Sequence, residues 1–278
     1  MFHGPIPAER YYSYLTWNDI DKMSNKTNVI LIQPIGAIEQ HGAHLPLITD
    51  DAIGLQVIGK TLEQFSSQDN PVVYVLPPQH SGRSTEHISF PGTISLSATT
   101  LTSLLMDIGE SVYRSGFRKL VFFNSHGGQP QVMEIVARDL RQRYSDFLLF
   151  PIFIWHLPNV GQTLVTPHEF KCGIHAGDIE TSLMLTFLKK YVKMDLAKKE
   201  YPSTVMSEHD LLGIEGGLAY AWVTKDLSQS GVIGDPTGAT QDKGERILAS
   251  LVTSFKKLLK EIYEFHFWIQ KIKIKCIR

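Results

Sequence analysis

The chain has 278 residues, of which 43% are hydrophobic and 20% are charged, and its 27 Lys and Arg nearly balance its 28 Asp and Glu. This composition is ordinary for a globular protein and excludes the fibrous and disordered classes. Because the net charge is near zero, electrostatics give no reason to expect nucleic acid or a membrane surface as a partner. We therefore expect a small-molecule partner and one domain over residues 1–278.

The sequence gives no sign of export or of a membrane span. A span requires about 18 consecutive apolar residues, and no such stretch is present. The first residues, MFHGPIPAER, lack the charged start and apolar core of a signal peptide. We expect a cytoplasmic protein in which Cys172 and Cys276 are reduced thiols, since two cysteines make no disulfide framework.

Regular elements can be predicted along most of the chain. Residues 1–28 are expected to form a packed arm with a short helix. The apolar runs rich in β-branched residues predict strands at residues 29–32, 72–76, 120–123 and 147–154, the last of them buried. Apolar residues at helical spacing predict helices at residues 52–65, 101–113, 132–144, 175–191 and 240–268. This alternation predicts a three-layer α/β/α sandwich with a mainly parallel sheet.

The other segments are expected to be loops or loosely held ends. Residues 79–97 are rich in Gly, Pro and polar residues, and a loop of this length is best explained by a function. Residues 163–173 are also expected to be a loop, and the glycine-rich segment 195–239 is expected to wrap the site or a subunit contact. The tail KIKIKCIR predicts either a short amphipathic strand or a frayed end.

Potential metal ligands cluster after the first predicted strand. This segment carries Glu39, His41, His44, Asp50 and Asp51, and we expect Asp50 or Asp51 to be the N-cap of the next helix. The third strand runs into NSHGG, which contains His126, and Glu180 lies at the start of a later helix. In parallel α/β sheets the side chains at the carboxyl ends of strands converge. The predicted ligands are Glu39, His41, Asp50, His126 and Glu180.

Two imidazoles and three carboxylates without a thiolate suit Zn²⁺, Mn²⁺ or Fe²⁺ in a catalytic site. Five ligands exceed what one catalytic metal usually takes from side chains, so we expect two divalent ions. A carboxylate such as Asp50 can bridge ions about 3.5–4 Å apart. In the simpler alternative, Glu39 and Asp50 only cap a loop and a helix.

Five segments in order resemble the creatininase family of metal-dependent amidohydrolases: PIGAIEQHGAHLPLITDD, EHISFPGTISL, NSHGG, HAGDIETSLML and GVIGDPTGAT. The resemblance covers about residues 29–245. It implies a three-layer α/β/α fold, a dinuclear metal centre and a hexameric assembly. Residue by residue, it implies the ligands Glu39, His41, Asp50, His126 and Glu180, with Asp50 bridging, and His175 as the catalytic histidine.

The sequence departs from the members that hydrolyse creatinine in two places. Those members have a metal-binding glutamate at the position of Gly128. Their pocket tryptophans are only partly matched, because Trp155 is present but the loop before His175 offers Phe170 and Lys171. We expect Trp155 to bind substrate, but the departures argue against creatinine. The NSHGG form is more similar to relatives that remove a formyl group from a pyrimidine amide or trim a peptide.

The hypothesis is hydrolysis of the C–N bond of a small, cyclic or formyl amide. One metal would polarise the carbonyl, and a hydroxide bridging the two metals would attack it. His175 would pass a proton to the leaving nitrogen or, alternatively, would orient a metal ligand. The rival functions are a creatininase-like peptidase, a non-catalytic metal-binding scaffold and a dinuclear phosphoesterase.

Four further residues near the predicted ligands are candidates for the site. Glu86 and His87 are candidate catalytic residues, although they could equally contact a neighbouring subunit or cap their loop. Gly127 and Gly128 could let the backbone approach a metal or substrate, or form a tight turn. In the same loop as Glu86, Arg83 could pair with a substrate carboxylate or phosphate, or form a surface salt bridge.

Overall fold

The computed structural model describes residues 2–66, 70–202 and 211–266. Its sheet has four parallel strands in the order β2-β1-β3-β4. All four predicted strands are present, and β1 is longer at its carboxyl end than its apolar run. The strands are β1 (Ile30–Ile35), β2 (Val73–Val75), β3 (Lys119–Asn124) and β4 (Leu148–Phe153).

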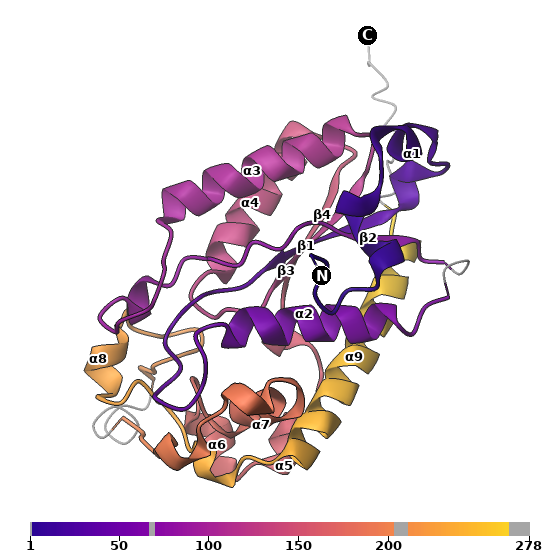
Figure 1. Cartoon of the computed structure of the whole chain (residues 1–278). Helices are drawn as coiled ribbons and strands as arrows, with labels where there is room; N and C mark the ends of the chain where they lie inside the picture. The colour runs from indigo at the N-terminus through magenta and orange to yellow at the C-terminus, as the bar shows by residue number, and fades with distance from the viewer. Residues whose placement is uncertain (1, 67–69, 203–210, 267–278) are drawn as a thin grey trace.

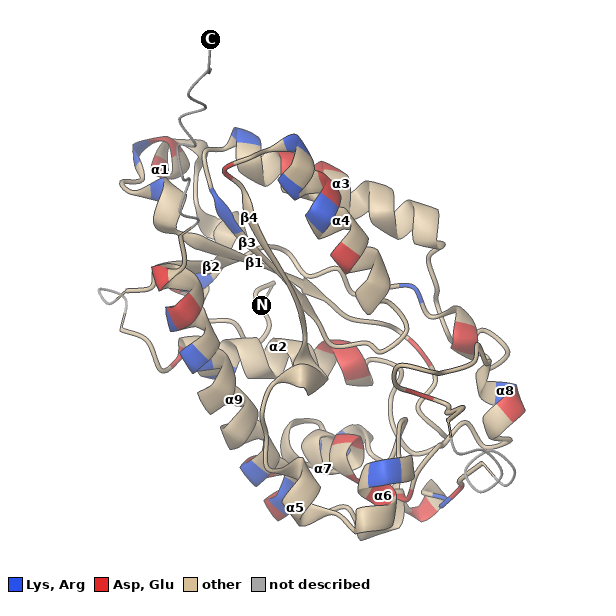
Figure 2. Ribbon diagram, turned by 180° about the vertical axis from the view of Figure 1, so that it is seen from behind, with Lys and Arg blue, Asp and Glu red and all other residues tan. Residues whose placement is uncertain are grey.

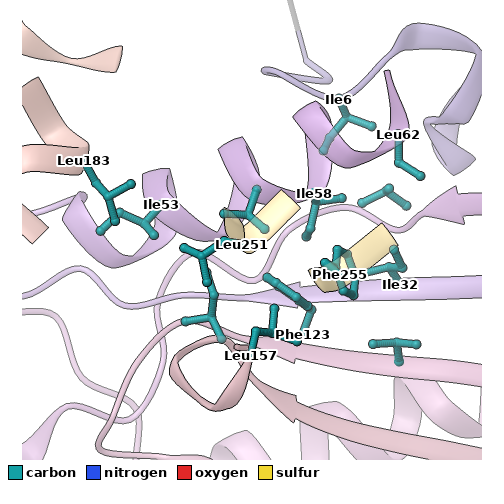
Figure 3. Close-up of a cluster of buried hydrophobic side chains, with 14 of the residues drawn as sticks. Ile6, Ile32, Ile53, Ile58, Leu62, Phe123, Leu157, Leu183, Leu251 and Phe255 are labelled. Atoms are coloured by element: carbon teal, nitrogen blue, oxygen red, sulfur yellow. The ribbon is translucent and has the colours of Figure 1, made fainter. Parts of the chain in front are cut away.

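Helices cover both faces of this sheet. Alternate residues of a strand point to opposite faces: Leu31 and Phe122 pack under α3 (Ala98–Arg114) and α4 (Pro130–Arg143). Ile32 and Phe123 instead pack under α2 (Thr49–Leu62) and α9 (Gln241–Glu264). Figure 1 shows these helical layers, and Figure 3 shows the core beneath α2 and α9. The predicted three-layer α/β/α fold is confirmed.

The strand order reverses between β1 and β3. The chain passes from β1 to β2 on one side and later returns to place β3 on the other side of β1. The last residues of these central strands, Ile35 and Asn124, are paired, so the loops that follow leave the sheet side by side. Ligands of open α/β sheets bind at such a reversal, beyond the carboxyl ends of the strands.

The loop predicted at residues 163–173 is wrong. This part of the chain forms α5 (Gly161–Leu164) and α6 (Pro167–Cys172). Thr166 caps α6 by accepting a hydrogen bond from the backbone N–H of Glu169, and Pro167 occupies the first turn. These are ordinary start signals of a helix, and the loop prediction overlooked them.

The helix predicted over 175–191 begins and ends elsewhere. α7 spans Asp178–Phe187, and a 3-10 turn follows at Lys189–Tyr191. His175 instead pairs with Ile233 in an antiparallel bridge, with N–H···O distances of 3.1 and 2.9 Å. Ala176 has φ +55°, in the left-handed region that non-glycine residues adopt rarely. The histidine is therefore held on an extended segment.

Two other predictions are corrected by the structure. Ile48 is the N-cap of α2, so Asp50 and Asp51 lie in the first turn and cap nothing. Their carboxylates face histidines instead. β4 is not a buried strand, because it forms an edge of the sheet and most of its residues are partly or fully exposed.

The remaining segments agree largely with expectation. The N-terminal arm contains α1 (Trp17–Lys22), capped by Thr16, and residues 79–97 hold only a 3-10 turn at Thr85–His87. The segment 195–239 includes the short α8 (Thr224–Leu227). The tail from residue 267, with Cys276, lies outside the described residues. The remaining 3-10 turns are Ala8–Arg10, Tyr12–Tyr14, Lys26–Asn28, Ile154–His156, Met194–Leu196 and Pro236–Gly238.

Within the described ranges, no helix combines the length and apolar character that crossing a membrane requires.

Candidate metal centre

The five predicted ligands come together beyond the carboxyl ends of β1 and β3. The loop after β1 supplies Glu39 and His41, and the loop after β3 supplies His126. Asp50 comes from the first turn of α2, red in Figure 2, and Glu180 from the first turn of α7. Glu180 is half-buried and the other four are buried.

Asp50 lies between the two imidazoles. Its Oδ1 atom is 3.2 Å from His41 Nε2, and its Oδ2 atom is 2.9 Å from His126 Nδ1. Glu39 Oε2 lies 3.1 Å from the same Nδ1 atom of His126. Ligand atoms of Glu39, Asp50 and His126 lie within 4.8 Å of one another, as do those of His41, His175 and Glu180. Each set is compact enough to surround a cation.

The charges of this centre perturb one another strongly. Burial disfavours charge on His41, but Asp50, Glu180 and Glu39 outweigh burial and raise its pKa to about 9. Likewise, Glu39 and Asp50 raise the pKa of His126 well above its ordinary value against the effect of burial. Burial raises the pKa of Glu180 to about 7, and repulsion from Asp50 contributes. A buried cluster of acids that hold protons this tightly is short of positive charge.

His175 lies beside the ligands with one ring nitrogen held by the backbone. Its Nε2 atom is 2.7 Å from the carbonyl oxygen of Gln40 and donates its proton there, while Nδ1 faces Glu39 Oε1 at 3.9 Å. The ring lies 4.2 Å from that of His41 and 4.1 Å from that of His87, between centroids. Burial lowers the pKa of His175 well below its usual value, and both histidines lower it further. The imidazole is therefore neutral, with a free lone pair on Nδ1.

The loop 79–97 brings Glu86 and His87 to the centre. Glu86 Oε1 lies 2.9 Å from His126 Nε2, and His87 Nε2 lies 3.5 Å from Glu39 Oε1. The pKa of His87 is lowered, mainly by burial. Both side chains thus contact predicted ligands, as their candidate roles require, and neither caps the loop.

Uncharged residues that the sequence did not single out hold these groups. Gln40 Nε2 and Thr224 Oγ1 lie 2.8 and 2.7 Å from His87 Nδ1 and fix the ring from two sides. Ser84 Oγ donates to Glu39 Oε2 at 2.5 Å. Gln40 stands between two predicted ligands, which is a signal of sorts, but Thr224 lies far along the chain and carries none.

The predicted substrate-binding residues have mixed surroundings. Arg83 Nη1 donates to the carbonyl oxygen of Gly128 at 2.8 Å, so the guanidinium holds the loop after β3. Trp155 is half-buried against the core under α9. A Cβ on Gly127 would meet only Phe153 Cζ, at 3.9 Å, so this glycine borders open space. A role for these residues in substrate binding stays a prediction.

The other potential ligands of the first loop serve elsewhere. His44 Nε2 lies 2.9 Å from Thr181 Oγ1, and burial lowers the pKa of this histidine to about 4. Asp51 Oδ2 lies 2.8 Å from His80 Nδ1. Cys172 is a buried free thiol whose pKa burial raises, so it lacks the properties of a nucleophile.

Known proteins match this chain along most of its length. The family profile described as "Creatinine amidohydrolase" matches residues 13–259. The chain is 31% identical over 237 residues to the "Mycofactocin precursor peptide peptidase" of Mycolicibacterium smegmatis, covering 83% of this chain and 84% of that one. It is 27% identical over 257 residues to the "Creatinine amidohydrolase" of Pseudomonas putida, covering 89% and 95%.

The fold matches solved structures as well. A structure described as "Creatininase Mn" superposes with a TM-score of 0.74 and 25% identity, covering 92% of this chain and 99% of that one. The named relatives hydrolyse amide bonds of different substrates, one a peptide and the other creatinine. Fold, ordered motifs and extent of the match agree: the chain belongs to the creatininase family of hydrolases.

Proposed function

We propose that this protein is a metal-dependent amidohydrolase that cleaves the C–N bond of an amide. Membership of a hydrolase family supports the reaction class. The observation that carries the metal dependence is the position of Asp50, whose two carboxylate oxygens face the imidazoles of His41 and His126 separately. A carboxylate in this position can serve two cations at once.

The donor set fits two divalent ions. Glu39, Asp50 and His126 would hold one ion, and Asp50 would share the second with His41 and Glu180. Buried carboxylates and imidazoles without a thiolate suit Mn²⁺, Zn²⁺ or Fe²⁺. When bound, such a pair supplies a Lewis acid for the amide carbonyl and lowers the pKa of a water molecule.

His175 would then move the proton that amide cleavage requires. Its neutral Nδ1 atom faces the centre and can accept a proton, and its Nε2 proton is committed to the carbonyl of Gln40. This bond fixes the tautomer and the direction of the lone pair. The same Nδ1 atom would deliver the proton to the leaving nitrogen as the C–N bond breaks.

A peptide bond is the second candidate target. The relatives at 31–33% identity are named peptidases, whereas the creatinine amidohydrolase is 27% identical. A Gly at position 128 also separates this chain from the creatinine-hydrolysing members that it resembles. Both observations favour a peptide or a formyl amide over creatinine.

The experiment that tests the proposal compares substrates under defined metal loading. Metal-stripped protein would be reconstituted with Mn²⁺, Zn²⁺ or Fe²⁺ and assayed with creatinine, N-formyl amides of pyrimidines, short peptides and an aryl phosphate. We expect turnover of an amide only in the presence of metal. Tight metal binding without turnover would support a scaffold, and turnover of the phosphate alone would support a phosphoesterase.

The hexamer implied by the resemblance also remains a proposal. Light scattering on the purified, metal-loaded chain measures its mass in solution directly. A mass of six chains of 31.3 kDa would support it, and a monomer would contradict it.

A further inference from the structure

Glu86 meets the face of His126 that points away from the other ligands. The Oε1 atom of Glu86 lies 2.9 Å from His126 Nε2, whereas the Nδ1 atom of the same ring faces Asp50 and Glu39. Both Glu86 Oε1 and His126 Nε2 are buried, and among the described residues neither has a partner in ordinary hydrogen-bond geometry. Each of these atoms is therefore available to the other.

We propose that Glu86 is a positioning residue, which accepts the Nε2 proton of His126 and so presents the Nδ1 lone pair to the metal. The inference rests on the proposed function, since it requires a cation between His126, Glu39 and Asp50. A ligating histidine usually donates its other ring N–H to a carboxylate or carbonyl, which fixes the tautomer and makes the ligand more basic. In this chain that acceptor comes from the distant loop 79–97.

Gly128 is what makes room for this carboxylate. A Cβ at position 128 would lie 1.9 Å from Glu86 Oε1 and 2.5 Å from His126 Nε2, distances that no side chain tolerates. At the adjacent Gly127, a Cβ would meet only Phe153 Cζ at 3.9 Å. The two neighbouring glycines therefore have different reasons, and only that of Gly128 is tied to Glu86.

The backbone around Glu86 is fixed from two other parts of the chain. Thr224 Oγ1, at the start of α8, donates to the carbonyl oxygen of Glu86 at 2.8 Å. Arg83 Nη1 lies 3.9 Å from Glu86 Oε2 and donates to the carbonyl of Gly128. This network gives the carboxylate a defined position, as a residue that orients a ligand requires.

The test is calorimetric titration of Mn²⁺ into metal-stripped protein, which needs no substrate. E86A and G128A should each weaken the affinity for one of the two ions about 10- to 100-fold, while both sites still fill at saturation. E86Q should lose less, because its amide oxygen can still accept the proton. G127A is the matched control, with the same added methyl in the same loop, and should keep the wild-type affinity.

Two outcomes would overturn the inference. Wild-type Mn²⁺ affinity in both E86A and G128A would show that the contact does not position the histidine. Loss of one ion from E86A even at saturation would make Glu86 a direct ligand instead. Thermal unfolding of the metal-free variants controls for misfolding, and the nearly isosteric E86Q keeps the test open if E86A does not fold. A wild-type protein that binds both ions and hydrolyses no amide would fail the proposed function alone.

Discussion

The two ends of strand β3 handle buried charge in opposite ways. At the amino end, Lys119 is 1% exposed, and its amine donates to the carbonyl oxygens of Ile262 and Tyr263 at 2.9 and 2.5 Å. These carbonyls belong to the last turn of α9, where the helix dipole is negative. The chain thus supplies all that this cation needs.

At the carboxyl end the chain does not neutralise what it buries. Among the described residues, the ion-pair contacts of Glu39 and Asp50 are with histidines, which can be neutral, and not with Lys or Arg. Glu180 accepts a backbone N–H, from Ala176, at 2.6 Å. The comparison separates two tasks: the amino end of the strand serves the fold, and the carboxyl end requires cations from outside. The predictions below alter one end at a time.

The largest effect is expected from Asp50→Asn, which removes a charge from the position between the two imidazoles. An amide offers only one oxygen ligand, so both ions should bind more weakly and amide hydrolysis should fall to background. Metal content by mass spectrometry and turnover of the identified amide measure these effects. Asp51→Asn is the matched control, because Asp51 faces His80 instead. Equal losses in both variants would contradict the assignment of Asp50.

His175→Ala should have a smaller effect at the same end of the strand. Removing a residue that transfers a proton should lower kcat about 10²- to 10⁴-fold, and the content of two ions should be retained. His156→Ala is a suitable control, because His156 is exposed after β4 and packs on Phe153. Full activity of the His175 variant would remove this residue from the mechanism. Loss of metal would make it a ligand.

The sequence predicts the layered fold and the convergence of the ligands for one physical reason. Buried parallel strands are apolar, and their carboxyl ends must lie at the same edge, so residues that follow β1 and β3 meet there. His126 and Asp50, 76 positions apart, come within 2.9 Å in this way. The periodicity of the chain carries this information.

The supporting contacts could not be predicted, because loop conformations decide them. Thr224 reaches His87 across 137 positions, and nothing in its neighbourhood marks a hydroxyl for this use. The carboxylate of Asp50 was expected to cap α2, a choice that local sequence favours. It faces His41 and His126 instead, and such competition between a local and a distant partner is visible only in three dimensions.

The smallest predicted effect is at the amino end, where Lys119→Met should change stability but neither metal affinity nor turnover. Burial lowers the pKa of Lys119 to about 8. Between that pH and the ordinary lysine value of about 10.4, the folded state has released a proton that the unfolded state still holds. Wild-type stability therefore gains from this group as pH rises, because the neutral amine still donates its hydrogen bonds without the cost of a buried charge.

Urea unfolding of wild type and Lys119→Met at about pH 7.5 and about pH 10 measures the difference, since subtracting the variant cancels the other titrating groups. The free-energy difference should shift in favour of the wild type at the higher pH. A shift toward the variant would mean that the α9 carbonyls stabilise the ammonium more than burial destabilises it. A change in Mn²⁺ affinity would show that the two ends of β3 are coupled after all.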